Sequence, residues 1–337
     1  MSATPTAPTS PAPPAGSAAA RPAQHVHRGT IALEDAAVLS HTHLAGNQHV
    51  LRLHCPRCAA GAGPGSFVHL RCSGELPMRR PMSILRASAT DGWVELLYKV
   101  VGAGSRALVA AQPGQVLSVL GPIGRGFTPH RERPRVLALG GGVGIPPMVF
   151  LAERLTALAA AGSASDAQPP RAGAGAVWKP LVLMGSELPF PFPVRPSTIL
   201  VPGMPDEAIG CMPLLDGIGV PSRLASLAGF AGCFDGYVTD LARAWLRGLD
   251  AAALAQVELF ACGPTPMLAA AAHLAREFGL PCQVSLEEFM ACAVGGCAGC
   301  AVAVHTEGGI AMKRVCVDGP VFEANSVFPA EGPLSRS

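Results

Sequence analysis

Four cysteines near the carboxyl end constrain the fold of this chain more than any other feature. Cys292, Cys297 and Cys300 follow the pattern C-x4-C-x2-C, and Cys316 comes after fifteen intervening residues. This is the plant-type spacing of thiolates that hold a [2Fe-2S] cluster. Such a cluster needs a tight loop whose backbone N–H groups can point at the sulfurs. The run contains three glycines that permit this loop, Gly295, Gly296 and Gly299.

Zinc binding or simple burial are the alternatives for these cysteines. Zinc sites usually show two short C-x2-C pairs, whereas this run has one such pair and one x4 step, so the spacing favours iron–sulfur. Cys55 and Cys58 form another C-x2-C pair beside His54, where a three-ligand metal site or redox function stays open. Four further cysteines are expected to be small buried or loop residues: Cys72, Cys211, Cys233 and Cys282.

Composition restricts the class of protein. The 337 residues suggest about two domains, and a hydrophobic content of 49% argues against wholesale disorder. A net charge of +2 gives no electrostatic case for nucleic acid or an anionic membrane as the main partner. The most apolar stretch, residues 136–151, is interrupted by four glycines and two prolines, and the N-terminus lacks a basic segment before an apolar one. We therefore expect a cytoplasmic protein without a disulfide framework.

The first part of the chain predicts a barrel. Residues 1–24 are rich in proline and alanine and are expected to form a disordered tail. Region 25–130 reads as short strands separated by Gly/Pro turns, which is typical of a small antiparallel barrel. Its clearest strands are expected at residues 50–53, 67–70, 93–98 and 116–120.

The pattern changes in region 131–283, where apolar strands alternate with helices. This alternation predicts a doubly wound parallel sheet, which makes the whole chain a multi-domain β plus α/β protein. Strands are expected at residues 136–139, 181–185, 198–201 and 257–261, and helices at 147–160, 240–249 and 266–278. Residues 161–177 read as a low-complexity loop. Region 284–330 then forms the cluster segment, with short strands at 301–304 and 313–315.

Two strand-to-helix turns are candidates for nucleotide binding. The first, GGGVGIPP at residues 140–147, permits close approach of a phosphate to backbone N–H groups at a helix start, although it departs from G-x-G-x-x-G. The second, CGPTPM at residues 262–267, places Cys262 at the carboxyl end of a strand, where ligands of doubly wound sheets bind. The alternative for Cys262 is a helix-initiating turn with a bystander thiol. In the barrel region, Arg80 and Ser83 of the run RRPMS can both donate to a pyrophosphate, unless the run is only a solvated basic turn.

Taken together, the motifs resemble a known family. The order of barrel, RRPMS, LGGGVGIPPM, CGPTPM, SLEEFMAC and the four cysteines is similar to the ferredoxin–NADP reductase superfamily. Within it, the order is most similar to the electron transfer subunits of dihydroorotate dehydrogenase B. The resemblance covers about residues 28 to 328. The N-terminal tail, the loop at 161–177 and the long Gly/Pro-rich stretch at 204–232 are departures that touch no motif.

The resemblance implies the site residues and cofactors. An FAD-binding barrel would use the R-P-x-S motif and two further segments, here Arg80, Pro81, Met82, Ser83, Leu97, Tyr98, Lys99, Gly104 and Ser105. An NAD-binding domain would use the two glycine turns, here Gly141, Gly142, Gly144, Gly263 and Pro264, with Cys262 as the catalytic residue. The [2Fe-2S] cluster would be held by Cys292, Cys297, Cys300 and Cys316.

The implied function is an electron relay that moves electrons between NAD(H), FAD, the cluster and a partner protein. The resemblance names the partner as the FMN-containing catalytic subunit of a dihydroorotate dehydrogenase in pyrimidine biosynthesis, within a heterotetramer. One alternative is an NAD(P)H-dependent reductase component of another multicomponent enzyme, such as an oxygenase, a hydrogenase or a glutamate synthase. Another is a redox sensor without enzyme activity, which NADH-dependent dye reduction would exclude.

Overall fold

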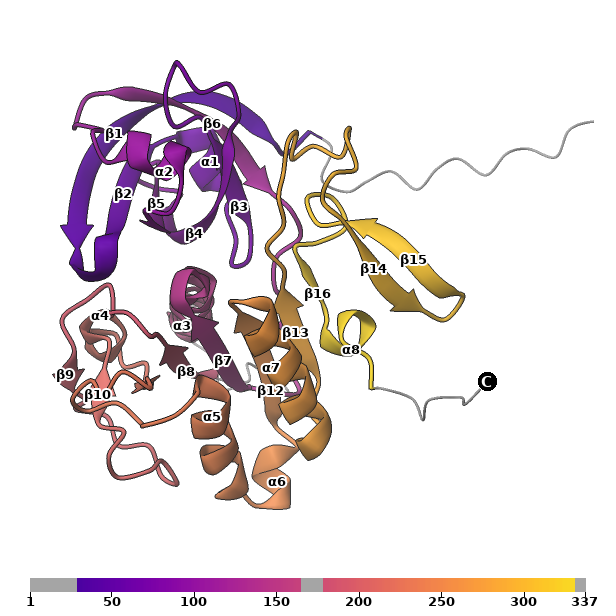
Figure 1. Cartoon of the computed structure of the whole chain (residues 1–337). Coiled ribbons are helices and arrows are strands. Elements are labelled where there is room, and N and C mark those ends of the chain that lie inside the picture. The colour runs from indigo at the N-terminus through magenta and orange to yellow at the C-terminus, as the bar shows by residue number, and fades with distance from the viewer. Residues whose placement is uncertain (1–28, 165–177, 331–337) are drawn as a thin grey trace, which may run out of the picture.

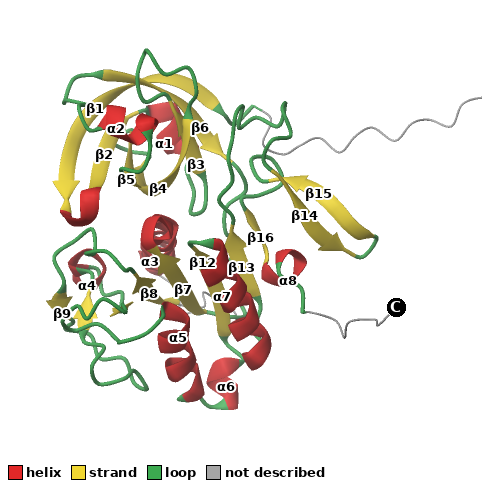
Figure 2. Cartoon of the chain, in the orientation of Figure 1, coloured by secondary structure: helices red, strands yellow, loops and turns green. Residues whose placement is uncertain are grey.

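The computed structural model describes residues 29–164 and 178–330. The predicted tail at 1–24 and the part of the predicted loop from residue 165 onward lie outside this range. In chain order, the described part forms an antiparallel barrel, a sheet flanked by helices, and a C-terminal segment that lies beside the barrel (Figure 1 and Figure 2). This arrangement confirms the predicted fold class.

The barrel closes through six strands in the order β1-β2-β5-β4-β3-β6, with every neighbouring pair antiparallel. Side chains alternate between its two faces, so that Leu51 and Leu53 of one strand are both fully buried. The predicted strands are confirmed. The barrel elements are β1 (Ala32–Leu44), η1 (Ala45–Asn47), β2 (Gln48–His54), α1 (Pro56–Gly61), β3 (Phe67–Leu70), β4 (Arg80–Ser88), β5 (Trp93–Lys99), α2 (Ala103–Leu108) and β6 (Val116–Ile123).

The second region is built on a six-stranded sheet in the order β11-β8-β7-β12-β13-β16. All pairs in this sheet are parallel except the last, in which β16 runs antiparallel to β13. The strands are β7 (Arg135–Gly141), β8 (Lys179–Gly185), β11 (Ser222–Ala225), β12 (Val257–Cys262), β13 (Cys282–Ser285) and β16 (Val321–Glu323). The helices and turns are η2 (Gly142–Gly144), α3 (Ile145–Ala164), α4 (Pro213–Gly217), α5 (Val238–Arg247), α6 (Ala251–Leu254) and α7 (Thr265–Phe278).

Both faces of this sheet are covered, as a doubly wound sheet requires. Leu137 and Leu139 of β7 belong to the core that contains α5 and α7, whereas Val136 and Ala138 belong to the core that contains α3. The helix α3 also contacts the barrel, because Arg86 of β4 donates to a carboxylate on it at 2.9 Å. In Figure 1, α3 lies between the barrel and the sheet.

The prediction of a strand at residues 198–201 is wrong. The side chains of Ser197 and Thr198 donate to the carboxylate of Asp216 at 2.7 and 2.6 Å, which holds this stretch in a loop, and Leu200 is 86% exposed. Local hydrogen bonds of this kind compete with strand pairing. The nearby pairing is instead a two-residue ladder between β9 (Arg195–Pro196) and β10 (Gly210–Cys211).

Among the described residues, one helix passes a length and composition test for a membrane span. It covers Gly142–Ala160, and 56% of its most apolar window is buried inside the protein. Met148, Val149 and Leu151 of this helix are core residues. Its apolar character is therefore explained by packing between the sheet and the barrel.

The C-terminal segment folds back on the rest of the chain. Its hairpin, β14 (Ala301–Thr306) and β15 (Gly309–Arg314), projects at the side of the molecule (Figure 1). The strand β16 then returns to the main sheet, and α8 (Ala324–Val327) follows it. The segment is thus anchored to the sheet at both ends, by β13 before the cysteines and by β16 after them.

Candidate functional site

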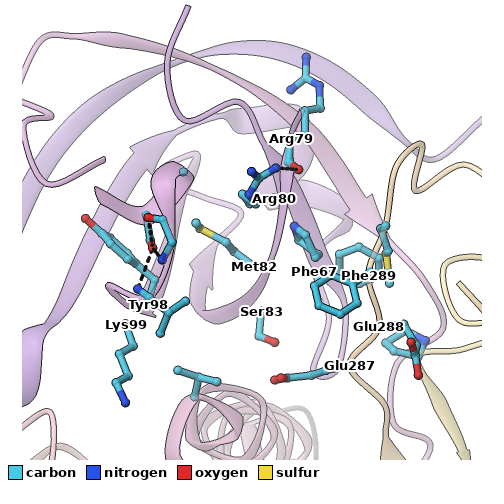
Figure 3. Close-up of a pocket in the computed structure, with 18 of the residues that line it drawn as sticks. Phe67, Arg79, Arg80, Met82, Ser83, Tyr98, Lys99, Glu287, Glu288 and Phe289 are labelled. Carbon is cyan, nitrogen blue, oxygen red and sulfur yellow. Dashed lines mark hydrogen bonds between the residues drawn. The ribbon is translucent and has the colours of Figure 1, made fainter. Parts of the chain in front are cut away.

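A pocket with a volume of about 930 Å³ lies between the barrel and the segment that follows β13 (Figure 3). The two sides come from chain segments about 200 residues apart, which the fold brings together. Every residue predicted for flavin contact lines it: Arg80, Pro81, Met82, Ser83, Leu97, Tyr98, Lys99, Gly104 and Ser105. Three separate segments of the barrel, identified by motif alone, therefore converge on one cavity.

Two adjacent arginines at the start of β4 have different contacts. Arg79 donates to the carbonyl oxygens of His69 and Ser118 at 3.2 and 2.7 Å and to the Ser118 hydroxyl at 2.8 Å, which joins β4 to the neighbouring strands. Arg80 donates to the carbonyls of Met78 and Arg79, both at 3.1 Å, and its side chain faces the pocket (Figure 3). Because a guanidinium has five N–H donors, Arg80 retains donors for a phosphate.

The turn before α2 completes this end of the pocket. The Ser105 hydroxyl accepts from the backbone N–H groups of Val101 and Gly102 at 2.9 and 3.1 Å, which fixes the entry to the helix. A Cβ on Gly104 would lie 2.9 Å from Nε and 3.0 Å from Cγ of Arg80. Glycine at this position therefore lets the Arg80 side chain lie directly against the helix.

The opposite wall of the pocket is a stretch that sequence reasoning did not assign to the site. It comprises residues 285–291, from the last residue of β13 to the residue directly before Cys292. Burial raises the pKa of the Glu287 carboxyl, which points into the pocket near Ser83 (Figure 3). The signal in the sequence was the run SLEEFMAC, which contributed to the resemblance but had no assigned contact.

The two glycine turns touch each other at the carboxyl edge of the sheet. A Cβ on Gly144 would lie 2.2 Å from the carbonyl oxygen of Cys262 and 2.5 Å from the nitrogen of Gly263. The backbones are thus in direct contact, which only glycine permits. Of these turns Val143 lines the pocket, whereas the predicted NAD-binding residues do not line it: Gly141, Gly142, Gly144, Gly263 and Pro264.

Cys262 ends β12 and is 1% exposed. Burial, with a smaller contribution from the charge of Glu287, raises the pKa of its thiol well above the usual range, although a hydrogen bond with Ser285 opposes this. The thiol is therefore neutral rather than an activated thiolate. Its catalytic role stays a prediction.

The four predicted cluster ligands come together in the C-terminal segment. The sulfurs of Cys300 and Cys316 are 3.3 Å apart, and the N–H of Cys297 donates to the sulfur of Cys292 at 3.4 Å. Burial, followed by the hydrogen bond and the charge of Cys300, raises the pKa of Cys316 to about 12, and the charge of Cys292 makes a smaller contribution in the same direction. Crowded thiolates of this kind repel one another unless a metal centre compensates their charge, so the donor set fits an iron–sulfur cluster.

The loop that carries the first cysteines supplies N–H donors. Ala293, Gly295 and Ala298 have positive φ angles of 56°, 81° and 55°, a conformation in which successive N–H groups turn to one side. Burial raises the pKa of Cys292, but N–H groups of the loop together lower it to about 7. The loop thus favours the thiolate, which is the form that binds iron.

The remaining cysteines show no such arrangement. Cys55 and Cys58 are fully buried in the barrel core, where a hydrogen bond with Cys55 and burial raise the pKa of the Cys58 thiol above the usual range. His54, in contrast, is exposed and does not share the buried surroundings of these two cysteines. The expectation of small buried or loop residues is confirmed for the others: Cys72, Cys211 and Cys282 are buried, and Cys233 is half-buried.

Comparison with known proteins identifies the family. A profile of the iron–sulfur cluster binding domain of dihydroorotate dehydrogenase B matches residues 287–328. The chain is 31% identical over 290 residues to the dihydroorotate dehydrogenase B (NAD(+)) electron transfer subunit of Desulforamulus reducens, covering 86% of this chain and 95% of that protein. This chain belongs to the family of dihydroorotate dehydrogenase B electron transfer subunits. The subunit of the same name from Bacillus caldolyticus is 34% identical over 271 residues, covering 78% of this chain and 86% of that protein.

Solved structures agree with this membership. The structure of an NADH-dependent reduced ferredoxin–NADP oxidoreductase, described for flavin-based electron bifurcation, superposes with a TM-score of 0.64 and 27% identity, covering 87% of this chain and 90% of that chain. The ferredoxin reductase in carbazole 1,9a-dioxygenase superposes with a TM-score of 0.52 and 21% identity, covering 74% of this chain and 67% of that chain. The second likeness concerns the fold alone.

Proposed function

We propose that this chain passes electrons between NAD(H) and the FMN of a dihydroorotate dehydrogenase catalytic subunit, and so serves pyrimidine biosynthesis. A nicotinamide exchanges two electrons as hydride and an iron–sulfur cluster exchanges one at a time, and a flavin such as FAD can do both. Dihydroorotate would supply the electrons and NAD⁺ would receive them. The chain itself contributes three binding sites and their relative placement.

We assign these sites by region. The barrel region 25–130 would bind FAD through the nine pocket residues from Arg80 to Ser105, with Arg80 on the pyrophosphate. Region 131–283 would bind NAD(H) at the turns that carry Gly141, Gly142, Gly144, Gly263 and Pro264, beside Cys262. Region 284–330 would hold the [2Fe-2S] cluster through Cys292, Cys297, Cys300 and Cys316.

One observation carries the proposal: the wall of the pocket and the cluster loop are continuous. Residues 285–291 line the pocket, Cys292 is the next residue, and Gly299 beside Cys300 lines the pocket again. Close approach of the two sites is what electron transfer between them needs. A chain in which the cluster only stabilised the fold would not need to place it against the pocket.

The partner is proposed from the names of the relatives, which are subunits of dihydroorotate dehydrogenase B. We propose a heterotetramer of two such chains and two catalytic subunits, located in the cytoplasm. A second candidate function is favoured by the likeness to the NADH-dependent ferredoxin–NADP oxidoreductase structure at 27% identity. In that case the chain would be the reductase component of another multicomponent enzyme.

The test is reconstitution with the dihydroorotate dehydrogenase catalytic subunit encoded in the same genome. The two chains should co-purify, and the complex should reduce NAD⁺ with dihydroorotate, whereas neither chain alone should do so. The chain alone should still reduce a two-electron dye with NADH. Dye reduction together with neither co-purification nor dihydroorotate-dependent NADH formation would favour the second candidate.

A further inference from the structure

Three histidines gather on the inner face of the barrel, outside the site described above. His41 and His43 lie two residues apart on β1 and therefore point to the same face of the sheet. His49 of β2 is directly opposite His43, and Tyr98 of β5 is directly opposite His49. Three neighbouring strands thus place three imidazoles and one phenol side by side. One ligand nitrogen from each histidine lies within 4.8 Å of the others.

An irregularity in β1 creates this arrangement. The register with β2 shifts between Val38 and Ser40, a β-bulge that changes which residues face inward. Before the bulge, Ala36 and Val38 are buried in the barrel core. In a regular strand every second residue faces the same side, so the even-numbered residues after Val38 would also face the core. The odd-numbered His41 and His43 would then face outward. The bulge therefore turns both histidines toward His49.

The hydrogen bonds leave ring nitrogens available to a cation. His41 Nδ1 lies 3.0 Å from the carbonyl oxygen of Ala111, which can only accept, so Nδ1 carries the proton and Nε2 presents its lone pair. A ligand histidine is typically oriented in this way, by a backbone carbonyl on its other nitrogen. His41 Nε2 lies 2.9 Å from the Tyr98 hydroxyl, which donates to it. A cation at Nε2 would take the place of that proton.

His49 adds a second, independent observation. Its side chain is 3% exposed, and its buried Nδ1 has no hydrogen-bond partner in the described part of the chain. An unpaired buried nitrogen is costly unless something binds it. The neutral imidazole is the form of histidine that ligates metals.

We propose that His41, His43 and His49 form a binding site for a late first-row divalent metal ion such as Zn²⁺, with Tyr98 or water in the fourth position. Imidazole ligands suit zinc, copper and nickel. In a tetrahedral zinc site with Zn–N bonds of ~2.0–2.1 Å, the nitrogens lie about 3.4 Å apart, so the side chains need only close inward by about 1 Å. His43 is exposed and can make this adjustment.

This site is separate from the iron–sulfur segment, because the β1–β2 hairpin lies on the opposite side of the barrel from β14 and β15 (Figure 1). It touches the pocket only through Tyr98, which belongs to both. The inference does not rest on the proposed function, since it uses only the histidines, Tyr98 and the Ala111 carbonyl.

The test is equilibrium dialysis of the FAD- and cluster-loaded protein against Zn²⁺, with zinc, iron and sulfide measured in each sample. The native protein should bind one Zn²⁺ per chain at micromolar concentration or below, with its iron and sulfide unchanged. His43→Ala should weaken zinc binding at least tenfold, because it removes an exposed ligand without opening the core. His54→Ala removes an exposed histidine at the far end of β2 and should bind zinc like the native protein.

Two further measurements separate the site from other zinc ligands. Tyr98→Phe should weaken zinc binding if the phenol is the fourth ligand and leave it unchanged if water is. If the phenol is the fourth ligand, adding zinc to the native protein should also produce a tyrosinate band in the ultraviolet difference spectrum. Zinc uptake that is the same in His43→Ala as in the native protein, or that is matched by loss of iron, would overturn the proposal. Absence of zinc binding at a hundred micromolar would overturn it as well.

Discussion

Replacing Gly144 with alanine tests the contact between the two glycine turns. The new Cβ would lie 2.2 Å from the Cys262 carbonyl oxygen, where an ordinary contact is 3.4 Å or longer, so the turns must separate by roughly 1 Å. Overpacking of this kind costs ~1–3 kcal/mol. For a domain of this size each kcal/mol lowers the Tm by about 2–4 °C. A 1 Å misplacement of a bound reactant costs about a hundredfold in rate.

We therefore expect Gly144→Ala to lower kcat/KM for NADH in dye reduction by about two orders of magnitude, with FAD and iron contents unchanged. Gly217→Ala in α4 is the matched control, because a Cβ there meets nothing within 4 Å and φ is not positive. Steady-state kinetics and thermal unfolding of both variants check the expectation. An unchanged kcat/KM in Gly144→Ala, or loss of FAD in proportion to activity, would refute the reasoning.

The remaining predictions concern the pocket, the cluster and pH. Arg80→Ala should lower FAD occupancy and leave the iron content unchanged, since charge-assisted hydrogen bonds contribute ~1.5–3 kcal/mol each. Arg79→Ala should instead lower the Tm. Equal loss of FAD in both variants would contradict this assignment. Cys300→Ser should lose iron and sulfide but keep NADH-driven dye reduction, and transfer to the partner at the native rate would show that the cluster is not on the path. A hydrogen bond with Glu258 and the charge of Glu258 raise the pKa of His130. The pair therefore stabilises the folded protein fully below pH ~6.5, and this stabilisation is lost as pH rises through the raised pKa. The Tm should then fall less between about pH 6 and about pH 8.5 in His130→Gln than in the native protein, and equal slopes would count against it.

Features set by short stretches of sequence could be predicted. The strand at residues 67–70 has the bounds that its apolar run indicated, and the four cysteines converge as their spacing required. Of the pocket residues, Arg80 and Ser83 were found by their chemistry, because both can donate to a pyrophosphate. The segments on β5 and α2 were assigned only through the resemblance to the family. All of them line one cavity, and their contact with FAD stays a proposal.

Features set by pairing between distant strands could not be predicted. The stretch at 198–201 has strand propensity, but hydrogen bonds to Asp216 override it. The wall at residues 285–291 belongs to the run SLEEFMAC, which contributed to the resemblance, but nothing local in it indicates contact with the barrel pocket that it lines. The three histidines face one another only because a bulge changes the parity of β1, and nothing in the sequence marks that bulge.

The four predicted cluster ligands differ in exposure, so the two sides of the cluster segment are not equivalent. Cys300 and Cys316 are each 3% exposed, and Cys300 follows Gly299, which lines the pocket. Cys292 is half-buried and Cys297 is exposed. Under the proposed function, electrons from the partner would enter on the side of Cys297, where a partner can approach without opening the pocket. They would leave on the side of the buried pair, toward the pocket. Because β13 and β16 fix both ends of the segment in one sheet, the distance between pocket and cluster would stay constant while the partner docks.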